Sequence, residues 1–317
     1  MLAISTNASE QELKSEIIKL IEINQIKIIS PTDITYSKLI GEGAQSKVYE
    51  GHYLRNHCSI KILKKVDYKS FMSELVILSH LVHPTIPKFY GIVFDKKNIS
   101  IVTEFIMGET LNNKILELDF NTKLKILKDI ANVLEYMHVN HIIHRDLKPE
   151  NIILDNKNKP YLIDYGFSKI CANKKNVMTS TKGTLHYLAP ESFEVKHFTE
   201  NEEVISIVSP KVDVWAFGCL VSYIFSGEIP WENYLKEKKG NNNINIEYYK
   251  NVINQIEFPI PNSILHLNEI CELIRLCTII DENRRINMTD VNDILYKYCW
   301  EHEEDQKATF AEEFNFK

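Results

Sequence analysis

The stretch His144-Arg145-Asp146-Leu147-Lys148-Pro149-Glu150-Asn151, followed further along by Asp164-Tyr165-Gly166, is the most informative part of this chain, because it brings together groups that handle protons and metal ions. Two short apolar runs, residues 152–154 and 161–163, lie between these motifs. The polar residues 155–160 separate the two runs, and this pattern predicts a β-hairpin.

In a symmetric hairpin centred on Lys157 and Asn158, Asn151 and Asp164 would lie directly opposite each other. An amide oxygen and a carboxylate would then face one site at the open end of the hairpin. A few hard oxygen ligands suit Mg2+, which completes its shell with water and substrate phosphates. A plain hairpin with polar ends would explain these two residues separately, but it would not explain Asp146 and Lys148. The sequence therefore predicts a magnesium site.

These motifs resemble the catalytic loop H-R-D-x-x-x-x-N and the metal-binding D-F-G of protein kinases, with Tyr165 in place of phenylalanine. The resemblance implies that Asp146 orients the attacking hydroxyl and accepts its proton. It also implies that Asn151 and Asp164 hold Mg2+ and that Lys148 stabilises charge on the transferring phosphoryl group. The expected fold is the α+β, two-lobed protein kinase fold, with a small, mainly β lobe that has one main helix and a larger, mainly α lobe.

The resemblance covers residues 34–300, which is the span of one kinase domain. We expect an N-terminal extension, a small lobe, a hinge, a large lobe and an acidic tail, over residues 1–30, 34–103, 104–108, 109–300 and 301–317. Pro31 marks the boundary between the extension and the domain.

Residues 9–23 are predicted to form an amphipathic helix. Ser9 and Glu12 match a capping box. Apolar residues then recur at helical spacing: Leu13, Ile17, Leu20 and Ile21. This helix either packs on the outside of the small lobe or serves as a docking or dimerisation element, and we favour the first interpretation.

Gly41-Glu42-Gly43-Ala44-Gln45-Ser46-Lys47-Val48 resembles the glycine-rich loop of protein kinases, except that Ser46 replaces the third glycine. Glycine lets backbone N–H groups approach phosphate oxygens without a side chain in between. Because two glycines remain and serine is small, we expect ATP to bind with some loss of loop flexibility. Taken alone, this segment also fits an ordinary hairpin turn.

Lys61 lies in an otherwise apolar strand, where a cation is costly unless it meets an anion. A helix is predicted after this strand, and its acids are Asp67 and Glu74. Glu74 lies in the middle of the helix and is the expected partner of Lys61. The resemblance implies that Lys61 also contacts the α- and β-phosphates of ATP. The apolar stripe of the helix comprises Phe71, Leu75, Leu78 and Val82.

Residues 102–108 resemble the hinge that binds adenine in protein kinases. Thr103 would be the gatekeeper residue, and Glu104 and Ile106 would offer main-chain groups. Ser59 takes the place of the alanine that usually lies above adenine. The complete set expected to bind ATP is Ile40, Gly41, Glu42, Gly43, Ala44, Ser46, Val48, Ser59, Lys61, Thr103, Glu104, Ile106 and Ile153.

The segment from Asp164 to Ala189-Pro190-Glu191 matches the activation segment of the family. Arg145 is a cation that, in the family, often meets a phosphorylated residue of this segment. An activating kinase or autophosphorylation would modify one of three hydroxyl residues: Thr179, Ser180 or Thr181. Thr184, with Lys148, resembles the serine/threonine kinases and is expected near Asp146 as a further catalytic residue.

The large lobe is expected to be mainly helical. A helix beginning near Asp119 would bury Leu124, Leu127, Ala131, Leu134 and Met137. Asp213-Val214-Trp215-Ala216-Phe217-Gly218 resembles the central helix of this lobe, and Arg285 is expected to pair with Glu191 as part of the scaffold. Two segments look like insertions, residues 195–210 and residues 236–246, and the polar composition of the second predicts a solvated loop.

Composition argues against several other classes of protein. The 317 residues carry a net charge of −6. The chain therefore lacks the surplus of basic residues that would indicate a nucleic acid partner. The six cysteines include no C-x-x-C pair, which favours reduced thiols in the cytoplasm and makes zinc an unexpected ligand. No window approaches the roughly 18 consecutive apolar residues of a membrane helix, and no secretory signal is visible, so we expect a soluble protein.

These features predict an enzyme that transfers the γ-phosphoryl group of Mg-ATP to serine and threonine hydroxyls of protein substrates. Residues 104–111 and 226–231 look most like the tyrosine-kinase-like group. The alternative is a pseudokinase that acts as a nucleotide-binding scaffold, motivated by Ser46, Ser59 and Tyr165. The tail carries Phe310, Phe314 and Phe316 and is expected either to be disordered, which we favour, or to fold back near the helix of Glu74.

Overall fold

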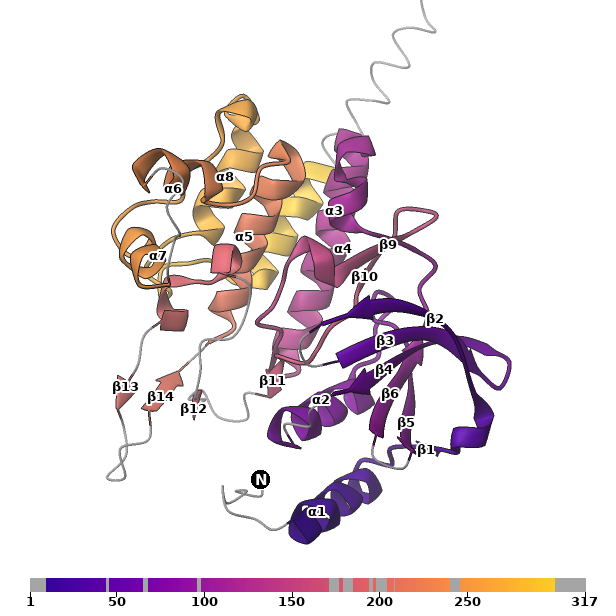
Figure 1. Cartoon of the computed structure of the whole chain (residues 1–317). Helices are drawn as coiled ribbons and strands as arrows, with labels where there is room; N and C mark the ends of the chain where they lie inside the picture. Colours follow the sequence, from indigo (N-terminus) through magenta and orange to yellow (C-terminus); the bar gives the residue numbers. More distant parts are fainter. Residues whose placement is uncertain are drawn as a thin grey trace, which may run out of the picture.

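The chain folds into two lobes, a small one built on a twisted sheet and a larger one that is mainly helical (Figure 1). This arrangement confirms the expected α+β, two-lobed architecture. The computed structural model describes residues 10–43, 46–64, 68–95, 98–170, 177–178, 185–193, 196–197, 204–207, 209–239 and 246–299.

The described part of the small lobe contains a six-stranded sheet with the strand order β1-β5-β6-β4-β3-β2. The strands are β1 (Ile28–Ile29), β2 (Ile34–Glu42), β3 (Ser46–Tyr53), β4 (Asn56–Leu63), β5 (Phe89–Asp95) and β6 (Asn98–Glu104). Neighbouring strands are antiparallel, except that β1 runs parallel to β5. The extension that precedes residue 34 therefore contributes an edge strand to the small lobe.

The two faces of this sheet have different surroundings. Ile60 and Val102 lie opposite each other on β4 and β6 and belong to a buried apolar cluster on one face. Val48, Lys61 and Ile101 lie opposite one another across β3, β4 and β6. Because side chains alternate along a strand, these three residues point to the other face. One face thus packs on a core of its own, and the other carries Lys61 beside Ile101, which belongs to the larger core of the molecule.

Helices α1 (Glu10–Ile23) and α2 (Tyr68–His80) lie next to each other below the sheet in Figure 1 and are in contact. Ile17 and Ile21 of α1 are buried, so the helix packs on the small lobe, in agreement with the favoured interpretation. Ser9 of the predicted capping box lies outside the described residues.

The predicted apolar stripe of α2 is correct for three of its four members. Phe71, Leu75 and Leu78 are buried, but Val82 is 83% exposed and lies beyond the end of the helix. Pro84 explains the difference, because proline disfavours helical backbone at the residue before it and cannot donate an N–H itself. The helix therefore stops before it reaches Val82.

Two helices form the centre of the large lobe, α4 (Phe120–Val139) and α5 (Lys211–Ser226). Asp119 caps α4 by accepting a hydrogen bond from the Thr122 N–H at 2.9 Å, and all five apolar residues expected on the buried face are buried. The other helices are α3 (Leu111–Lys114), α6 (Glu232–Lys239), α7 (Ile246–Ile253) and α8 (Asn268–Cys277), and residues 288–299 are also helical.

The large lobe also contains short strands. Strands β7 (Gly108–Thr110), β9 (Ile152–Asp155) and β10 (Pro160–Leu162) form one sheet, and β8 (Ile142–Ile143) pairs with β11 (Lys169–Ile170). Within residues 195–210, β13 (Lys196–His197) and β14 (Val204–Ile207) pair with each other, and β14 also pairs with β12 (Val177–Met178).

The prediction of a solvated loop over residues 236–246 was wrong at both ends. Residues 236–239 belong to α6, and α7 begins at Ile246. An ion pair one helical turn apart, between Lys236 and Glu232 at 2.8 Å, supports the last turns of α6. Residues 240–245, which carry the asparagines, lie outside the described residues.

The predicted hairpin is present as β9 and β10, but its register is shifted by one residue. Pro160 pairs with Leu154 and Leu162 with Ile152, and the Ile163 N–H donates to the Asn151 carbonyl at 3.0 Å. The direct opposition of Asn151 and Asp164 was therefore wrong. Turn chemistry sets this register, because the Asp155 carboxylate accepts hydrogen bonds from the N–H groups of Lys157 and Lys159.

Candidate active site

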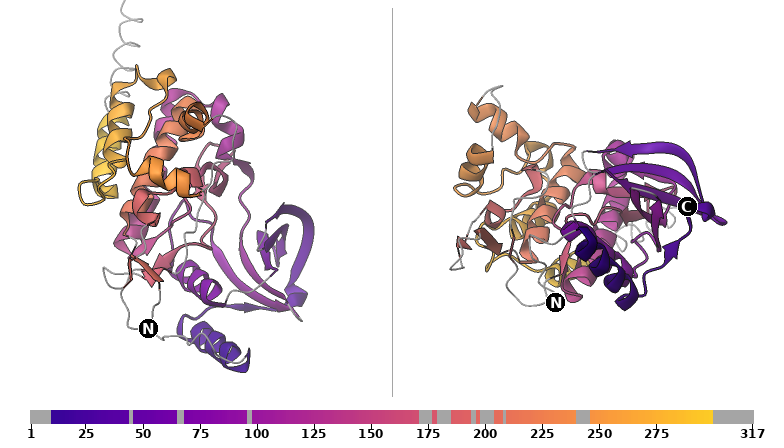
Figure 2. Two further views of the ribbon diagram at one scale, coloured as in Figure 1. Left: turned by 60° about the vertical axis from the view of Figure 1, so that its left-hand side comes forward. Right: turned by 60° about the horizontal axis from the view of Figure 1, so that its bottom comes forward.

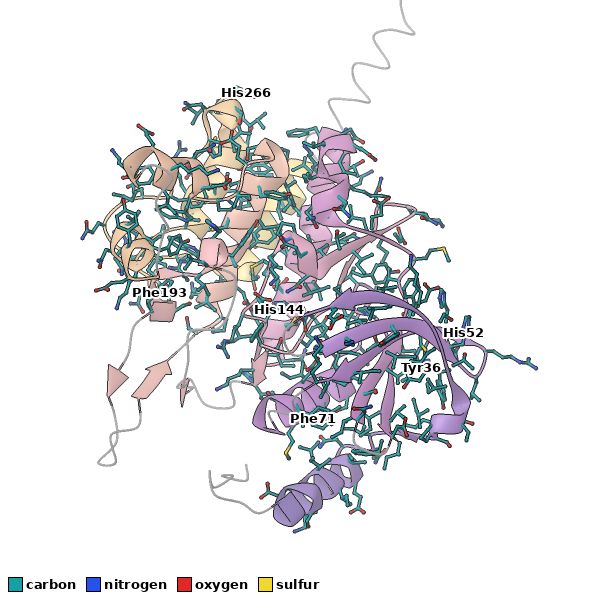
Figure 3. The ribbon with its side chains drawn as sticks, in the orientation of Figure 1. Tyr36, His52, Phe71, His144, Phe193 and His266 are labelled. Carbon is teal, nitrogen blue, oxygen red and sulfur yellow. The ribbon has the colours of Figure 1, made fainter. Side chains whose placement is uncertain are left out.

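A carboxylate from α5 holds the backbone of the loop that carries Asp146. The two oxygens of Asp213 accept hydrogen bonds from the backbone N–H groups of His144 and Arg145, each at 2.8 Å. Arg145 has a left-handed φ of 71°, a conformation that costs about 1–2 kcal/mol for a residue with a side chain. The hydrogen bonds to Asp213 compensate for this strain. His144 is fully buried near the centre of the molecule (Figure 3).

Asp146, Lys148 and Asn151 form one cluster on this loop. The Asp146 Oδ2 atom lies 2.9 Å from Lys148 Nζ and accepts a hydrogen bond from Asn151 Nδ2 at 2.9 Å. The same amide nitrogen donates to the Asp146 backbone carbonyl at 2.7 Å. Asp146 and Asn151 are buried. Their side chains are therefore held in one arrangement by the loop itself.

Asp164 lies just after β10 and joins the two lobes. Its Oδ1 atom accepts hydrogen bonds from the Gly166 N–H and from Lys61 Nζ, both at 3.1 Å. Lys61 belongs to β4 of the small lobe, whereas Asp164 belongs to the large lobe. The Asp164 side chain is 38% exposed, so it remains accessible from outside.

Glu74 is the anion that Lys61 meets in the small lobe. Lys61 Nζ lies 2.7 Å from Glu74 Oε1, and Glu74 is buried in the middle of α2. Gly166 lies beside these charged groups, and a Cβ atom there would make ordinary van der Waals contacts at 3.4 Å with Lys61 Nζ and Asp164 Oδ1. Lys61 thus bridges one carboxylate from each lobe.

The charges of this group are coupled. Burial tends to lower the pKa of Lys61, but the carboxylates of Glu74 and Asp164 outweigh it and raise that pKa, so Lys61 stays charged at neutral pH. Burial would likewise raise the pKa of Asp164, but Lys61 and the Gly166 N–H hold it below its usual value. Burial raises the pKa of Glu74, and Lys61 only partly offsets this effect.

Asn151 and Asp164 provide oxygen atoms at the open end of the β9–β10 hairpin. The amide nitrogen of Asn151 faces Asp146, so its amide oxygen points away from that residue. Over the described residues, no three or more His, Cys, Asp and Glu side chains gather into a metal cluster. One carboxylate and one amide oxygen fit Mg2+, which takes its remaining ligands from water and phosphates, and do not fit zinc.

Several residues expected to bind ATP share the sheet face of Lys61. Ser59 and Thr103 lie opposite each other on β4 and β6, two residues along from the pair formed by Lys61 and Ile101, and Val48 lies opposite Lys61. Ile153 is the expected ATP-binding residue of the large lobe. Its side chain is half-buried, whereas the residues on either side of it in β9 are fully buried. The structure therefore brings Val48, Ser59 and Thr103 together with Lys61.

The predicted hinge connects β6 to β7. The Glu104 N–H donates to the Lys88 carbonyl at 2.8 Å, so the main-chain group that Glu104 can offer to a nucleotide is its carbonyl. The Phe105 N–H donates to the His57 carbonyl at 3.2 Å, and Ile106 is buried.

The base of the glycine-rich segment is a hairpin between β2 and β3. Gly41 pairs with Val48, and the Gly43 N–H donates to the Ser46 carbonyl at 2.9 Å. Lys64 Nζ contacts Glu42 Oε1 at 2.6 Å and the Gly43 carbonyl at 2.9 Å. Ile40 is exposed, and Ala44 lies outside the described residues.

A comparison with protein families assigns residues 34–296 to the model described as a protein kinase domain. The chain belongs to the protein kinase family. The Aurora kinase of Debaryomyces hansenii is 35% identical over 216 residues, which is 63% of this chain and 49% of the relative. The Aurora kinase of Saccharomyces cerevisiae is 32% identical over 227 residues, 68% of this chain and 59% of the relative.

A plant relative is also similar. A probable LRR receptor-like serine/threonine-protein kinase of Arabidopsis thaliana is 31% identical over 220 residues, 65% of this chain and 20% of the relative. The kinase described here spans about half the length of the two Aurora kinases.

Other expectations for this kinase have mixed outcomes. Arg285 pairs with Glu191 through two contacts, Nη1 to Oε1 at 2.6 Å and Nη2 to Oε2 at 3.1 Å, as expected. None of the described cysteines forms a disulfide bond, and none of the described helices is long and apolar enough to span a membrane. The residues expected in phosphorylation, catalysis and tail docking lie outside the described residues: Thr179, Ser180, Thr181, Thr184, Phe310, Phe314 and Phe316.

The role of Asp213 in the active site of the kinase was not predicted from the sequence. This residue was expected only as part of the central helix of the large lobe, yet Asp213 holds the backbone of the catalytic loop and accepts a further hydrogen bond from His138 Nε2 at 2.9 Å. A signal was present, because Asp213 is the single acid in the otherwise mainly apolar helix α5. A buried carboxylate in such a helix needs several hydrogen-bond donors.

We predict that Tyr165→Phe weakens the fold without abolishing the activity of the kinase. The buried Tyr165 hydroxyl donates to the Leu162 carbonyl at 2.9 Å, and burial keeps the pKa of this hydroxyl well above its usual value, so it stays protonated. Removing one such hydrogen bond should cost about 1 kcal/mol of unfolding free energy. Urea denaturation measures this difference, and an equally stable variant would contradict the assigned role of the hydroxyl.

Proposed function

We propose that this chain is a serine/threonine protein kinase that transfers the γ-phosphoryl group of Mg-ATP to hydroxyls of protein substrates. The observation that carries this proposal is Lys61, which lies 2.7 Å from Glu74 and 3.1 Å from Asp164. Asp164 follows Ile163, whose N–H donates to the carbonyl of Asn151, and Asn151 belongs to the cluster with Asp146 and Lys148. Phosphoryl transfer requires mainly positioning and stabilisation of charge, and this group of residues provides both.

Each charged residue of the site has a distinct role in this proposal. Asp146 orients the acceptor hydroxyl and takes up its proton. Lys148, at 2.9 Å from Asp146, stabilises negative charge on the transferring group. Lys61 contacts the α- and β-phosphates, and Glu74 keeps the Lys61 ammonium in place. Thr184 contributes near Asp146, as the resemblance to serine/threonine kinases implies.

ATP would lie against the sheet face that carries Val48, Ser59 and Thr103, below the glycine-rich segment. The Glu104 carbonyl and the main chain of Ile106 would meet the adenine. Asn151 and Asp164 would hold Mg2+, which neutralises charge on the phosphates when bound. Both residues offer the hard oxygen atoms that this ion prefers.

Regulation, subgroup and location belong to the same proposal. Phosphorylation at Thr179, Ser180 or Thr181 would provide an anion for Arg145. Residues 104–111 and 226–231 support assignment to the tyrosine-kinase-like group, and the absence of C-x-x-C pairs supports a cytoplasmic location. The serine/threonine preference is further supported by the name of the Arabidopsis relative.

The pseudokinase alternative gains no specific support from the described residues. Ser46 and Ser59 lie in regularly paired strands, and the buried ring of Tyr165 leaves the Asp164 carboxylate in contact with Lys61. The substitutions that motivated this alternative therefore leave the charged site assembled.

The proposal is tested by incubating the purified chain with γ-labelled ATP and a generic basic protein, in the presence of either Mg2+ or excess EDTA. We expect label on phosphoserine and phosphothreonine after acid hydrolysis, and we expect EDTA to abolish it, because Asn151 and Asp164 require an ion to bind the phosphates. Label on phosphotyrosine alone, or equal label in EDTA, would contradict the proposal.

A further inference from the structure

Helix α1 packs against the helix that carries Glu74. Ile17 and Ile21 are only 3% and 5% exposed, and they belong to the same continuous cluster of buried side chains as Phe71 and Leu75 of α2. Figure 2 shows α1 next to α2 from two further directions, and Figure 3 marks Phe71 in the small lobe. The neighbouring Ile18 is 54% exposed, so two adjacent isoleucines of α1 differ: Ile17 is buried and Ile18 faces solvent.

The segment that follows α1 is fastened to the sheet. β1 pairs with β5 in parallel, and the Ile92 N–H donates to the Lys27 carbonyl at 2.9 Å. Gly91 makes this close approach feasible: its φ is 144°, and a Cβ atom there would lie 2.3 Å from the Lys27 carbonyl oxygen. The Lys27 ammonium also lies over the ring of Tyr53, at 5.1 Å from its centre. Both ends of the segment from α1 to β1 are thus attached to the small lobe.

Helix α2 is held by the core and by two neighbouring elements. Its Leu75 and Ile77 are fully buried in the cluster that also contains Ile92 and Ile101 of the sheet. Among the described elements, α1 and β11 lie alongside α2. A weak hydrogen bond from Ser73 Oγ to the Ser168 carbonyl, at 3.4 Å, joins α2 to the strand region of β11. The orientation of α2 sets the position of Glu74, because Glu74 lies in the middle of this helix. The family model begins at residue 34, so α1 and β1 lie outside the region that the family shares.

We propose that Ile17 and Ile21 are positioning residues for the phosphoryl-transfer site, which hold α2 where Glu74 meets Lys61. This inference rests on the proposed function for its catalytic readout. Loss of the packing of α1 would let α2 move, which would weaken the contact between Glu74 and Lys61 and misplace the Lys61 ammonium. Residues 10–29 would then be a part of the active enzyme that acts at a distance from the reacting atoms.

The test compares Ile17→Ala and Ile21→Ala with Ile18→Ala as the matched control, all in the full-length chain. We expect each of the first two variants to lower kcat/KM for Mg-ATP about tenfold, in the range of typical coupling between sites, and the control to match the wild type. Ile21→Val, which removes a single methylene group, should give a smaller change in the same direction. Equal effects of Ile17→Ala and Ile18→Ala would overturn the proposal.

Two further readouts separate positioning from general stabilisation. In the Glu74→Gln background, Ile17→Ala should cause no additional loss of Mg-ATP affinity, because residues that act through one contact are not additive. Amide hydrogen exchange should increase in α2 and stay unchanged in α5. Full additivity with Glu74→Gln, or an equal increase of exchange in both helices, would overturn the proposal.

The affinity and exchange measurements do not require turnover. A wild-type chain that binds Mg-ATP and transfers no phosphate would contradict the proposed function, while the effect of Ile17→Ala on binding and on α2 exchange would still decide this inference. These measurements therefore distinguish a failure of the proposed function from a failure of the inference about Ile17 and Ile21.

Discussion

Replacement of Asp146 by asparagine should lower kcat for phosphoryl transfer by about 10²–10⁴-fold, the usual contribution of a positioned general base. The carboxylate Oδ2 faces both Lys148 Nζ and the Asn151 amide nitrogen at 2.9 Å. An asparagine amide keeps the shape of this side chain but cannot take up the proton of the acceptor hydroxyl. Binding of ATP should persist, because Lys61 and Glu74 are unchanged.

Steady-state kinetics with labelled ATP measure this effect, and nucleotide titration checks that binding is retained. Asp293→Asn is a matched control, because Asp293 is an exposed acid of the large lobe that lies outside the site. We expect this control to behave as the wild type. If Asp146→Asn retained wild-type kcat, Asp146 would not be the base.

Replacement of Arg285 by leucine should lower the unfolding free energy by about 3–5 kcal/mol, because it leaves a buried carboxylate without its partner. The Arg285 side chain is fully buried and is bound to Glu191 through two contacts. Arg285 also donates hydrogen bonds to three backbone carbonyls. One belongs to Lys211 of α5, and the other two belong to Ile279 and Ile280, which precede Arg285 in the chain. One side chain thus holds three parts of the large lobe together.

Chemical denaturation of Arg285→Leu and of Arg284→Leu gives a sharp comparison. Arg284 is the adjacent residue and is exposed, so its replacement should change the stability by less than about 0.5 kcal/mol. Adding Glu191→Gln to Arg285→Leu should recover part of the loss, because the uncompensated charge is removed. Equal effects of the two arginine substitutions would contradict this account of the scaffold.

The elements set by local patterns could be predicted from the sequence. The spacing of apolar residues located α4, and the cost of a buried cation identified Glu74 as the partner of Lys61, a contact of 2.7 Å in the structure. The fold class followed from the resemblance of the two opening motifs to protein kinases. In each case the signal lies within one helix, one strand or one motif.

The features that depend on tertiary detail could not be predicted. The register of the β9–β10 hairpin follows from the side-chain hydrogen bonds of Asp155, and a shift of one residue changes which residues face each other. The pairing of β1 with β5 joins two short apolar runs that are distant in sequence, and it depends on the unusual backbone of Gly91. Composition alone carries no trace of either arrangement.

A crystal structure with Mg2+ and a non-hydrolysable ATP analogue tests the central claim most directly. We predict that Lys61 Nζ lies within hydrogen-bonding distance of the α- or β-phosphate, and that oxygen atoms of Asn151 and Asp164 share one metal ion with the phosphates. Asp146 should face the γ-phosphate. A nucleotide bound away from Lys61, or a metal ion held without Asp164, would contradict the assignment of this site.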